Sequence, residues 1–225
     1  MNRNNMKPIE QIMRTAPVIP VLVIEDASQA RPLAEALVRG GLPVLEVTLR
    51  TAAALEVIRE MTQVEGAIVG AGTVTSPAQL EQVRKAGVRF VVSPGLTAPL
   101  GEAAVGMGIP FLPGVATAGD IMRGLDLGLS HFKFFPAVAA GGIPALKALS
   151  APFTQAKFCP TGGIDIGNAA QWLALRSVLC VGGSWLVSPS GDPAETEVLA
   201  GQVAALGQGF NENGRASSVS LWEQD

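Results

Sequence analysis

The stretch "PVIPVLVIEDASQARPLAEALVRGGLPVLEVTL" (residues 17–49) contains the structural unit that decides the fold. It consists of an apolar run (17–24), a segment of helical period (26–41) and a second apolar run (43–49). The helical segment begins at Asp26, a residue type that caps helix N-termini, and it ends in glycine, which commonly terminates helices. Strands that are apolar on both faces and joined by an amphipathic helix indicate a parallel sheet covered by helices.

Apolar runs of this kind alternate with helix-period segments along almost the whole chain. The eight runs cover residues 17–24, 43–49, 67–73, 89–95, 110–116, 131–136, 157–163 and 177–186. Their even spacing, with Gly, Thr or Pro near their C-terminal ends, favours a (β/α)₈ barrel over the alternative of an open doubly wound sheet. We therefore predict an α/β fold, a (β/α)₈ TIM barrel with a short N-terminal helix over residues 8–14.

Length and composition are consistent with one domain. The chain has 225 residues and is 48% hydrophobic, which is enough for one sizeable core. No change in composition divides the chain before a polar end, so we predict a single barrel domain over residues 1–206 and a polar C-terminal tail over residues 207–225. The high apolar content also favours an oligomer, because exposed apolar surface is commonly covered by a second subunit.

Charge and motif content argue against several functional classes. Sixteen basic residues against nineteen acidic residues leave no excess positive charge for nucleic-acid phosphates. We found no apolar stretch of the length of a signal peptide or membrane span, so we expect a cytoplasmic protein without a membrane partner. The segment "GAGTVT" (70–75) lacks the third glycine of a dinucleotide fingerprint.

Few residues in this chain could bind a transition metal. His131 is the single histidine, and Cys159 and Cys180 are the two cysteines. Because both cysteines lie in apolar runs, we expect them to be buried, reduced thiols. The sequence therefore predicts no transition-metal site and no other cofactor, with a carboxylate-only magnesium site as the alternative.

Lys133 lies in an unusually apolar setting, the stretch "HFKFFP" (131–136). If Phe132 and Phe134 pack against helices, the alternation along a strand points Lys133 into the barrel near the strand's C-terminal end, where barrel enzymes collect their function. Burial disfavours the ammonium form and so favours a neutral amine that can attack a carbonyl carbon. The alternative is a lysine whose stem packs while its head reaches solvent.

The apolar run at residues 43–49 also carries charge, because Glu46 and Arg50 fall on one face at alternating positions with Thr48. One interpretation is a buried structural ion pair. The functional interpretation gives the two side chains different roles. Glu46 would transfer protons beside the lysine, and Arg50, at the strand end, would hold a substrate carboxylate through two hydrogen bonds.

Two glycine-rich turns, "PTGG" (160–163) and "GGS" (182–184), follow the last two predicted strands. Such turns often bind phosphate in barrels, although a tight turn is the usual meaning of a Gly-Gly pair. The residues together suggest Schiff-base chemistry on a phosphorylated oxo-acid. A non-covalent sugar-phosphate isomerase or epimerase and a catalytically silent phosphate-binding barrel are the alternatives.

Six motifs in order resemble the family of 2-keto-3-deoxy-6-phosphogluconate (KDPG) aldolase and 4-hydroxy-2-oxoglutarate (KHG) aldolase. The resemblance covers residues 10 to about 188, and the motifs are "LEVTLRT" (45–51), "VGAGTV" (69–74), "SPG" (93–95), "FKFFPA" (132–137), "FCPTGG" (158–163) and "VGGSWL" (181–186). It implies a homotrimeric class I aldolase of the Entner–Doudoroff pathway that forms pyruvate and glyceraldehyde 3-phosphate without a metal. Activity on 4-hydroxy-2-oxoglutarate is a further expectation.

The resemblance also assigns roles to individual residues. Lys133 matches the Schiff-base lysine, Glu46 the general acid/base and Arg50 the carboxylate-binding arginine. The remaining matches are Thr73, Pro94 and Phe135 in the pyruvyl pocket, Thr161 near the substrate hydroxyls, and Gly162, Gly163 and Ser184 in the phosphate site. The chain departs from the family at Val138, where an acidic residue is common, and in "GGIDIGN" (162–168), which replaces a proline-containing turn. These departures bear on substrate preference and phosphate affinity.

Overall fold

The computed structural model describes residues 6–187 and 191–209, which form alternating strands and helices. The strands are β1 (Val18–Leu22), β2 (Val44–Thr48), β3 (Ile68–Gly72), β4 (Phe90–Val92), β5 (Phe111–Leu112), β6 (Gly114–Val115), β7 (His131–Phe134), β8 (Lys157–Pro160) and β9 (Val181–Gly183). The helices are α1 (Pro8–Met13), α2 (Ala30–Arg39), α3 (Ala54–Met61), α4 (Pro77–Lys85), α5 (Ala98–Gly106), α6 (Ala118–Asp126), α7 (Gly142–Ser150), α8 (Ala169–Leu173) and α9 (Pro193–Ala204). Short 3₁₀ turns span Ala27–Gln29 and Ala205–Gly209.

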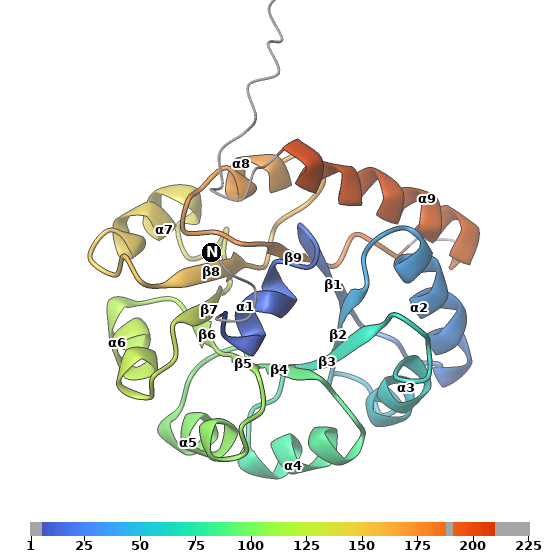
Figure 1. Cartoon of the computed structure of the whole chain (residues 1–225), viewed down its shortest axis with the longest axis horizontal. Helices are drawn as coiled ribbons and strands as arrows, with labels where there is room; N and C mark the ends of the chain where they lie inside the picture. The colour runs from blue at the N-terminus through green and yellow to red at the C-terminus, as the bar shows by residue number, and fades with distance from the viewer. Residues whose placement is uncertain (1–5, 188–190, 210–225) are drawn as a thin grey trace, which may run out of the picture.

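All strand pairs in the described chain are parallel, and they form two sheets. The larger has the order β5-β4-β3-β2-β1-β9 and the smaller the order β6-β7-β8. Isolated bridges join Phe158 to Val178 and Thr161 to Gly182. The strands lie around a centre with helices α2 to α9 on the outside (Figure 1). The predicted α/β class with a curled parallel sheet is therefore confirmed.

The hydrogen-bonded ladder differs from the single eight-stranded sheet that we predicted. The run at 110–116 is divided into β5 and β6 at Pro113, because proline cannot donate a hydrogen bond to a neighbouring strand. The last run, predicted over residues 177–186, contributes only the short strand Val181–Gly183. Between β8 and the segment around β9, pairing is thus reduced to the two isolated bridges, whereas at Pro113 the end of one sheet continues along the chain into the other.

Some helix boundaries follow the expected capping chemistry. Asp26 accepts a hydrogen bond from Ser28 N, so it caps a 3₁₀ turn that leads into α2. Ser76 accepts from Gln79 N and caps α4, which has proline at its first position. The predicted helix at residues 8–14 is present as α1.

The core has two layers. The larger lies between the strands and the outer helices. The smaller contains Ile9, Met13, Ile19, Val44, Phe90, Val92, Leu112, Cys159 and Cys180. Helix α1 supplies Ile9 and Met13 to this second cluster and lies in the middle of the strands in Figure 1. Both cysteines are free and buried, as predicted.

Strand β7 shows the alternation expected from its sequence. The ring of Phe134 lies 6.4 Å from that of Trp172 in α8, and the ring of Phe132 packs where a side chain at Gly124 of α6 would otherwise be. Both phenylalanines are fully buried in the layer that faces the helices. Lys133, between them, therefore points to the opposite side.

Within residues 6–187 and 191–209, no helix is both long and apolar enough to cross a bilayer. Most of the polar tail that we predicted, residues 210–225, lies outside the described residues.

Candidate active site

Lys133 and Glu46 form a buried ion pair between β7 and β2. Lys133 Nζ donates to both carboxylate oxygens of Glu46, at 2.8 Å and 3.2 Å, and the two side chains are only 7% and 4% exposed. The ammonium also lies 5.5 Å from the centre of the Phe135 ring. These contacts offset the loss of hydration on burial. The alternative in which the lysine head reaches solvent is therefore wrong.

Gly72 provides the space that the Glu46 carboxylate occupies. A Cβ atom at position 72 would lie 2.7 Å from Glu46 Cγ and 2.8 Å from Glu46 Cδ, too close for any side chain. We did not predict this role of Gly72 from the sequence. The available signal was the glycine immediately before Thr73 in "VGAGTV" (69–74).

Arg50 lies in the turn that follows β2, with its side chain exposed. Within the described chain its guanidinium makes no hydrogen bond or ion pair, and Glu46 pairs with Lys133 instead, so the interpretation of Glu46 and Arg50 as a structural ion pair is wrong. Thr48, between them, is buried and donates to Leu22 O at 2.9 Å. Arg50 therefore presents a free guanidinium beyond the end of the strand that carries Glu46.

Thr73 directly follows β3 and has a φ of +59°. This left-handed conformation is rare for a β-branched residue and is stable only where the surrounding structure enforces it. The preceding residue, Gly72, contacts the Glu46 carboxylate. The strained turn therefore begins beside that carboxylate. Strain of this kind at a strand end is typical of a functional site.

Pro94 lies in the exposed turn after β4. Its backbone packs against Gly114 of β6, where a Cβ atom would overlap the Pro94 carbonyl. Gly114 is in turn the register partner of Lys133. The structure thus brings Pro94 and Phe135 to the strand pair that carries the lysine.

The two glycine-rich turns meet at the carboxyl ends of β8 and β9. Thr161 is bridged to Gly182, and the threonine side chain fills the space that a side chain at Gly182 would need. Gly162 and Gly163 have φ values of +101° and +77°, which favour glycine. Ser184 follows β9 and is exposed.

Val138 is part of the same region. Its backbone N–H donates to Gly162 O at 3.0 Å, and its side chain packs against Gly163, where a Cβ atom would lie 2.7 Å from Val138 Cβ. Val138, at which the sequence departs from the resembled family, therefore contacts the turn proposed to bind phosphate.

The buried cysteines are poor candidates for a nucleophile. Burial raises the pKa of the Cys180 thiol well above its usual range, and the neighbouring Cys159 and the Glu46 charge act in the same direction. A thiol held in the protonated form is a weak nucleophile. Lys133 is the better candidate at this site.

The comparison with known proteins decides the family. The family model for KDPG and KHG aldolases matches residues 9–198. The chain belongs to the KDPG and KHG aldolase family. It is 57% identical over 195 residues to the 2-dehydro-3-deoxy-phosphogluconate aldolase of Zymomonas mobilis, a match that covers 87% of this chain and 93% of the relative.

Solved structures of aldolases in this family have the same fold. The KDPG aldolase of Zymomonas mobilis ZM4 with 3-phosphoglycerate is 56% identical and superposes with a TM-score of 0.88 over 89% of this chain and 97% of that one. The KDPG aldolase of Legionella pneumophila, with pyruvate captured as a covalent carbinolamine, is 46% identical and has a TM-score of 0.85 over 88% and 98% of the two chains.

Proposed function

We propose that this chain is a class I aldolase that cleaves 2-keto-3-deoxy-6-phosphogluconate to pyruvate and glyceraldehyde 3-phosphate. The observation that carries the proposal is the buried Lys133–Glu46 pair in a chain that is 57% identical to a KDPG aldolase. An amine and a carboxylate in contact can exchange the proton that imine chemistry requires. A non-covalent isomerase or epimerase has no comparable support from this site or from the relatives.

The geometry suggests how the amine becomes reactive. Transfer of a proton from Lys133 Nζ to Glu46, across 2.8 Å, leaves a neutral amine without moving either side chain. The amine attacks C2 of the substrate to form a carbinolamine, and Glu46 returns a proton to the departing hydroxyl, which leaves as water. The product is an iminium bonded to Lys133. The Legionella relative with its pyruvate carbinolamine supports the first of these steps.

The iminium then accepts the electron pair of the breaking C3–C4 bond. A base removes the proton of the C4 hydroxyl, glyceraldehyde 3-phosphate leaves, and an enamine of pyruvate remains on Lys133. Protonation of the enamine at C3 and addition of water at C2 release pyruvate and restore the amine. We assign the proton transfers at the pyruvate end to Glu46, because its carboxylate contacts the lysine.

The other residues would bind the substrate. We assign its carboxylate to the free guanidinium of Arg50 and the pyruvyl carbons to the pocket of Thr73, Pro94 and Phe135. Thr161 would contact the hydroxyls, and Gly162, Gly163 and Ser184 would hold the phosphate through backbone N–H groups and a hydroxyl. The Zymomonas structure with 3-phosphoglycerate supports a site for a phosphorylated three-carbon acid in this fold.

We extend the proposal to the architecture and assembly. The bridges from β8 to the segment around β9, together with the continuity of β5 and β6, support one closed (β/α)₈ barrel in a single domain up to residue 206. The family resemblance suggests a cytoplasmic homotrimer, and sedimentation would test the trimer. The KHG aldolase part of the family supports a second substrate, 4-hydroxy-2-oxoglutarate.

Borohydride trapping tests the covalent mechanism. With pyruvate and borohydride, we expect a reduced adduct on Lys133, located by peptide mass spectrometry, and cleavage of the phosphorylated substrate in a coupled assay. Lys157 provides an internal control, because it is a lysine on the neighbouring strand β8 whose ammonium contacts Arg176 O and, among the described residues, has no carboxylate partner within hydrogen-bond distance. An adduct on Lys157 with Lys133 unmodified would contradict the proposed role of Lys133.

A further inference from the structure

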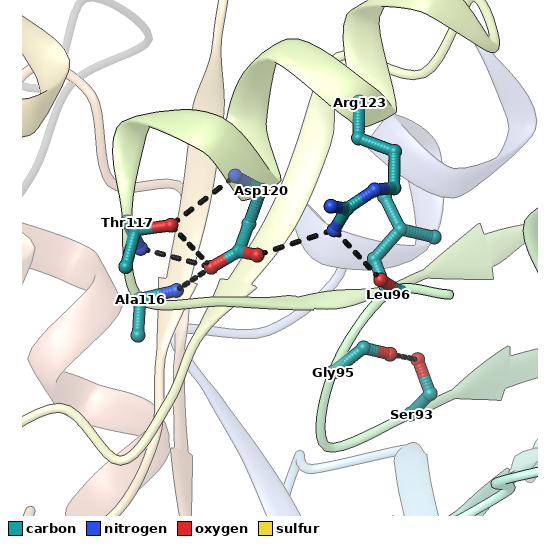
Figure 2. Close-up of polar contacts among 7 residues, drawn as sticks. All are labelled: Ser93, Gly95, Leu96, Ala116, Thr117, Asp120 and Arg123. Carbon is teal, nitrogen blue, oxygen red and sulfur yellow. Dashed lines mark hydrogen bonds and ion pairs between the residues drawn. The ribbon is translucent and has the colours of Figure 1, made fainter. Parts of the chain in front are cut away.

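Helix α6 begins with a set of hydrogen bonds that reaches beyond the helix itself. Asp120 Oδ2 accepts from Ala116 N at 3.1 Å, from Thr117 N at 3.0 Å and from Thr117 Oγ1 at 2.8 Å (Figure 2). Thr117 Oγ1 in turn accepts from Asp120 N, which completes a capping box. Asp120 therefore holds the chain where it leaves β6.

Arg123, one turn further along α6, reaches a different loop. Its Nη1 donates to Leu96 O at 3.1 Å and lies 3.4 Å from Asp120 Oδ1 (Figure 2). The side chain of Leu96 is buried against Gly101 of α5 and Gly124 of α6. The Asp120–Arg123 pair thus joins the loop after β4 to the segment after β6.

These two segments adjoin the strand that carries Lys133. Pro94 packs against Gly114, the register partner of Lys133, and Ser93 Oγ donates to Gly95 O at 2.7 Å within the same loop (Figure 2). Leu96, which Arg123 holds, is two residues from Pro94. A shift of this loop would therefore move Pro94, which we assign to the pyruvyl pocket, relative to Lys133.

The charges of the pair persist at neutral pH. Burial alone would raise the pKa of Asp120, but the hydrogen bonds from Ala116 and Thr117 and the charge of Arg123 outweigh it, so its pKa is lowered. Arginine side chains in general carry a positive charge at neutral pH. Asp120 consequently accepts its hydrogen bonds as a carboxylate, in the form that makes them strongest.

We infer that Asp120 and Arg123 are positioning residues for the pyruvate half of the substrate, because they hold the Pro94 loop against the strands that carry Gly114 and Lys133. This inference rests on the proposed aldolase function. A surface Arg–Asp pair with three-residue spacing would by itself add little to stability. The distinctive feature of this pair is its connection to two loops at the carboxyl ends of neighbouring strands.

The matched comparison is Arg123→Ala against Arg84→Ala. Arg84 pairs with Glu81 on α4 at the same three-residue spacing, and in the described chain its side chain has no other hydrogen bond. We expect Arg123→Ala to raise the pyruvate concentration for half-maximal borohydride trapping on Lys133 by roughly ten-fold. This is the scale of effect expected when a residue that lines a binding pocket, here Pro94, is displaced. We expect Arg84→Ala to leave it unchanged, and Arg123→Lys to recover part of the loss.

Two further measurements separate positioning from a loss of folding. Hydrogen exchange of the peptide covering residues 93–97 should be faster in Arg123→Ala and Asp120→Asn than in the parent protein. Saturating pyruvate should still label Lys133 completely in both variants, because the reacting groups are untouched.

Four outcomes would be decisive. Unchanged pyruvate dependence in Arg123→Ala, or equal losses in Arg123→Ala and Arg84→Ala, would overturn the inference. Unchanged exchange of residues 93–97 would overturn it as well. If the parent protein itself traps no pyruvate, the proposed function fails and the role of the pair in pyruvate binding fails with it, whatever the exchange measurement shows.

Discussion

The carboxylate of Glu46 on β2 occupies the space that a side chain at Gly72 on β3 would need. Strands β2 and β3 pair with Thr48 opposite Gly72, so Glu46 lies two residues earlier and extends its side chain along the strand. Its Cγ and Cδ atoms would lie 2.7 Å and 2.8 Å from a Cβ at position 72. The absence of a side chain there is what allows Glu46 to reach Lys133.

Gly72→Ala should therefore act on catalysis through Glu46. The added methyl group must displace the carboxylate, which we expect to lower kcat by roughly a hundred-fold, as for a misplaced catalytic group. Steady-state kinetics of cleavage would measure the effect. Gly106→Ala is the control, because no atom of the part of the chain that the structure describes lies within 4 Å of a Cβ at that position. Unaltered kcat in Gly72→Ala would show that the carboxylate position is not critical.

Breaking the Lys133–Glu46 pair should cost stability. Lys133→Met leaves the Glu46 carboxylate buried without a partner, which we expect to lower the free energy of unfolding by about 3–5 kcal/mol near neutral pH. Replacing both residues, with Lys133→Met and Glu46→Leu, should recover most of the loss because no charge remains buried. Urea titration of the three proteins would measure this. A double variant as unstable as Lys133→Met would refute the explanation.

Val138→Ala should affect phosphate binding selectively. The substitution removes the methyl groups that pack against Gly163, so the turn proposed to hold the phosphate loses its support. We expect the KM for the phosphorylated substrate to rise roughly five-fold, equivalent to about 1 kcal/mol of binding energy. The KM for 4-hydroxy-2-oxoglutarate, which has no phosphate, should not change. Val105→Ala, on α5, is a control at a similarly exposed valine.

If both substrates lose affinity equally in Val138→Ala, the valine does not act through the phosphate site.

His131 should make the fold sensitive to acid. Burial lowers the pKa of His131 below the ordinary value of 6.5; Glu10, with Oε2 at 3.4 Å, opposes this shift, and Lys7 and Arg14 add to it. The unfolded chain therefore binds the proton first as pH falls. The stability contributed by neutral His131 is complete above about pH 6.5 and is lost as pH falls towards the lower pKa of the folded state.

Urea titrations at about pH 7.5 and about pH 5.5 would measure this dependence. His131→Gln should reduce the difference in the free energy of unfolding between the two conditions. Glu10→Gln removes the opposing carboxylate and should enlarge that difference. The same pH dependence in His131→Gln as in the parent protein would contradict the assignment.

Local pattern was sufficient to predict much of the fold. Apolar runs located the strands of the described chain, and capping residues indicated several of the helices between them, because both signals depend on neighbours in the sequence. The predicted limits were too generous where pairing fails, as at Pro113 and at the ends of β9. Those limits depend on which backbone groups form hydrogen bonds with another strand. The partner strand is distant in sequence, so a local pattern cannot predict these hydrogen bonds.

The sequence by itself determined that Lys133 faces away from the helices, because side chains alternate along a strand and Phe132 and Phe134 require the apolar layer. It also indicated Glu46 as a candidate for proton transfer and the glycine-rich turns as a candidate phosphate site. Only the tertiary structure decided that Glu46, rather than solvent, pairs with Lys133 across 87 residues of chain, that Gly72 makes room for the carboxylate, and that Arg123 reaches Leu96. These contacts follow from strand register and helix packing, which place residues far apart in sequence at atomic distance.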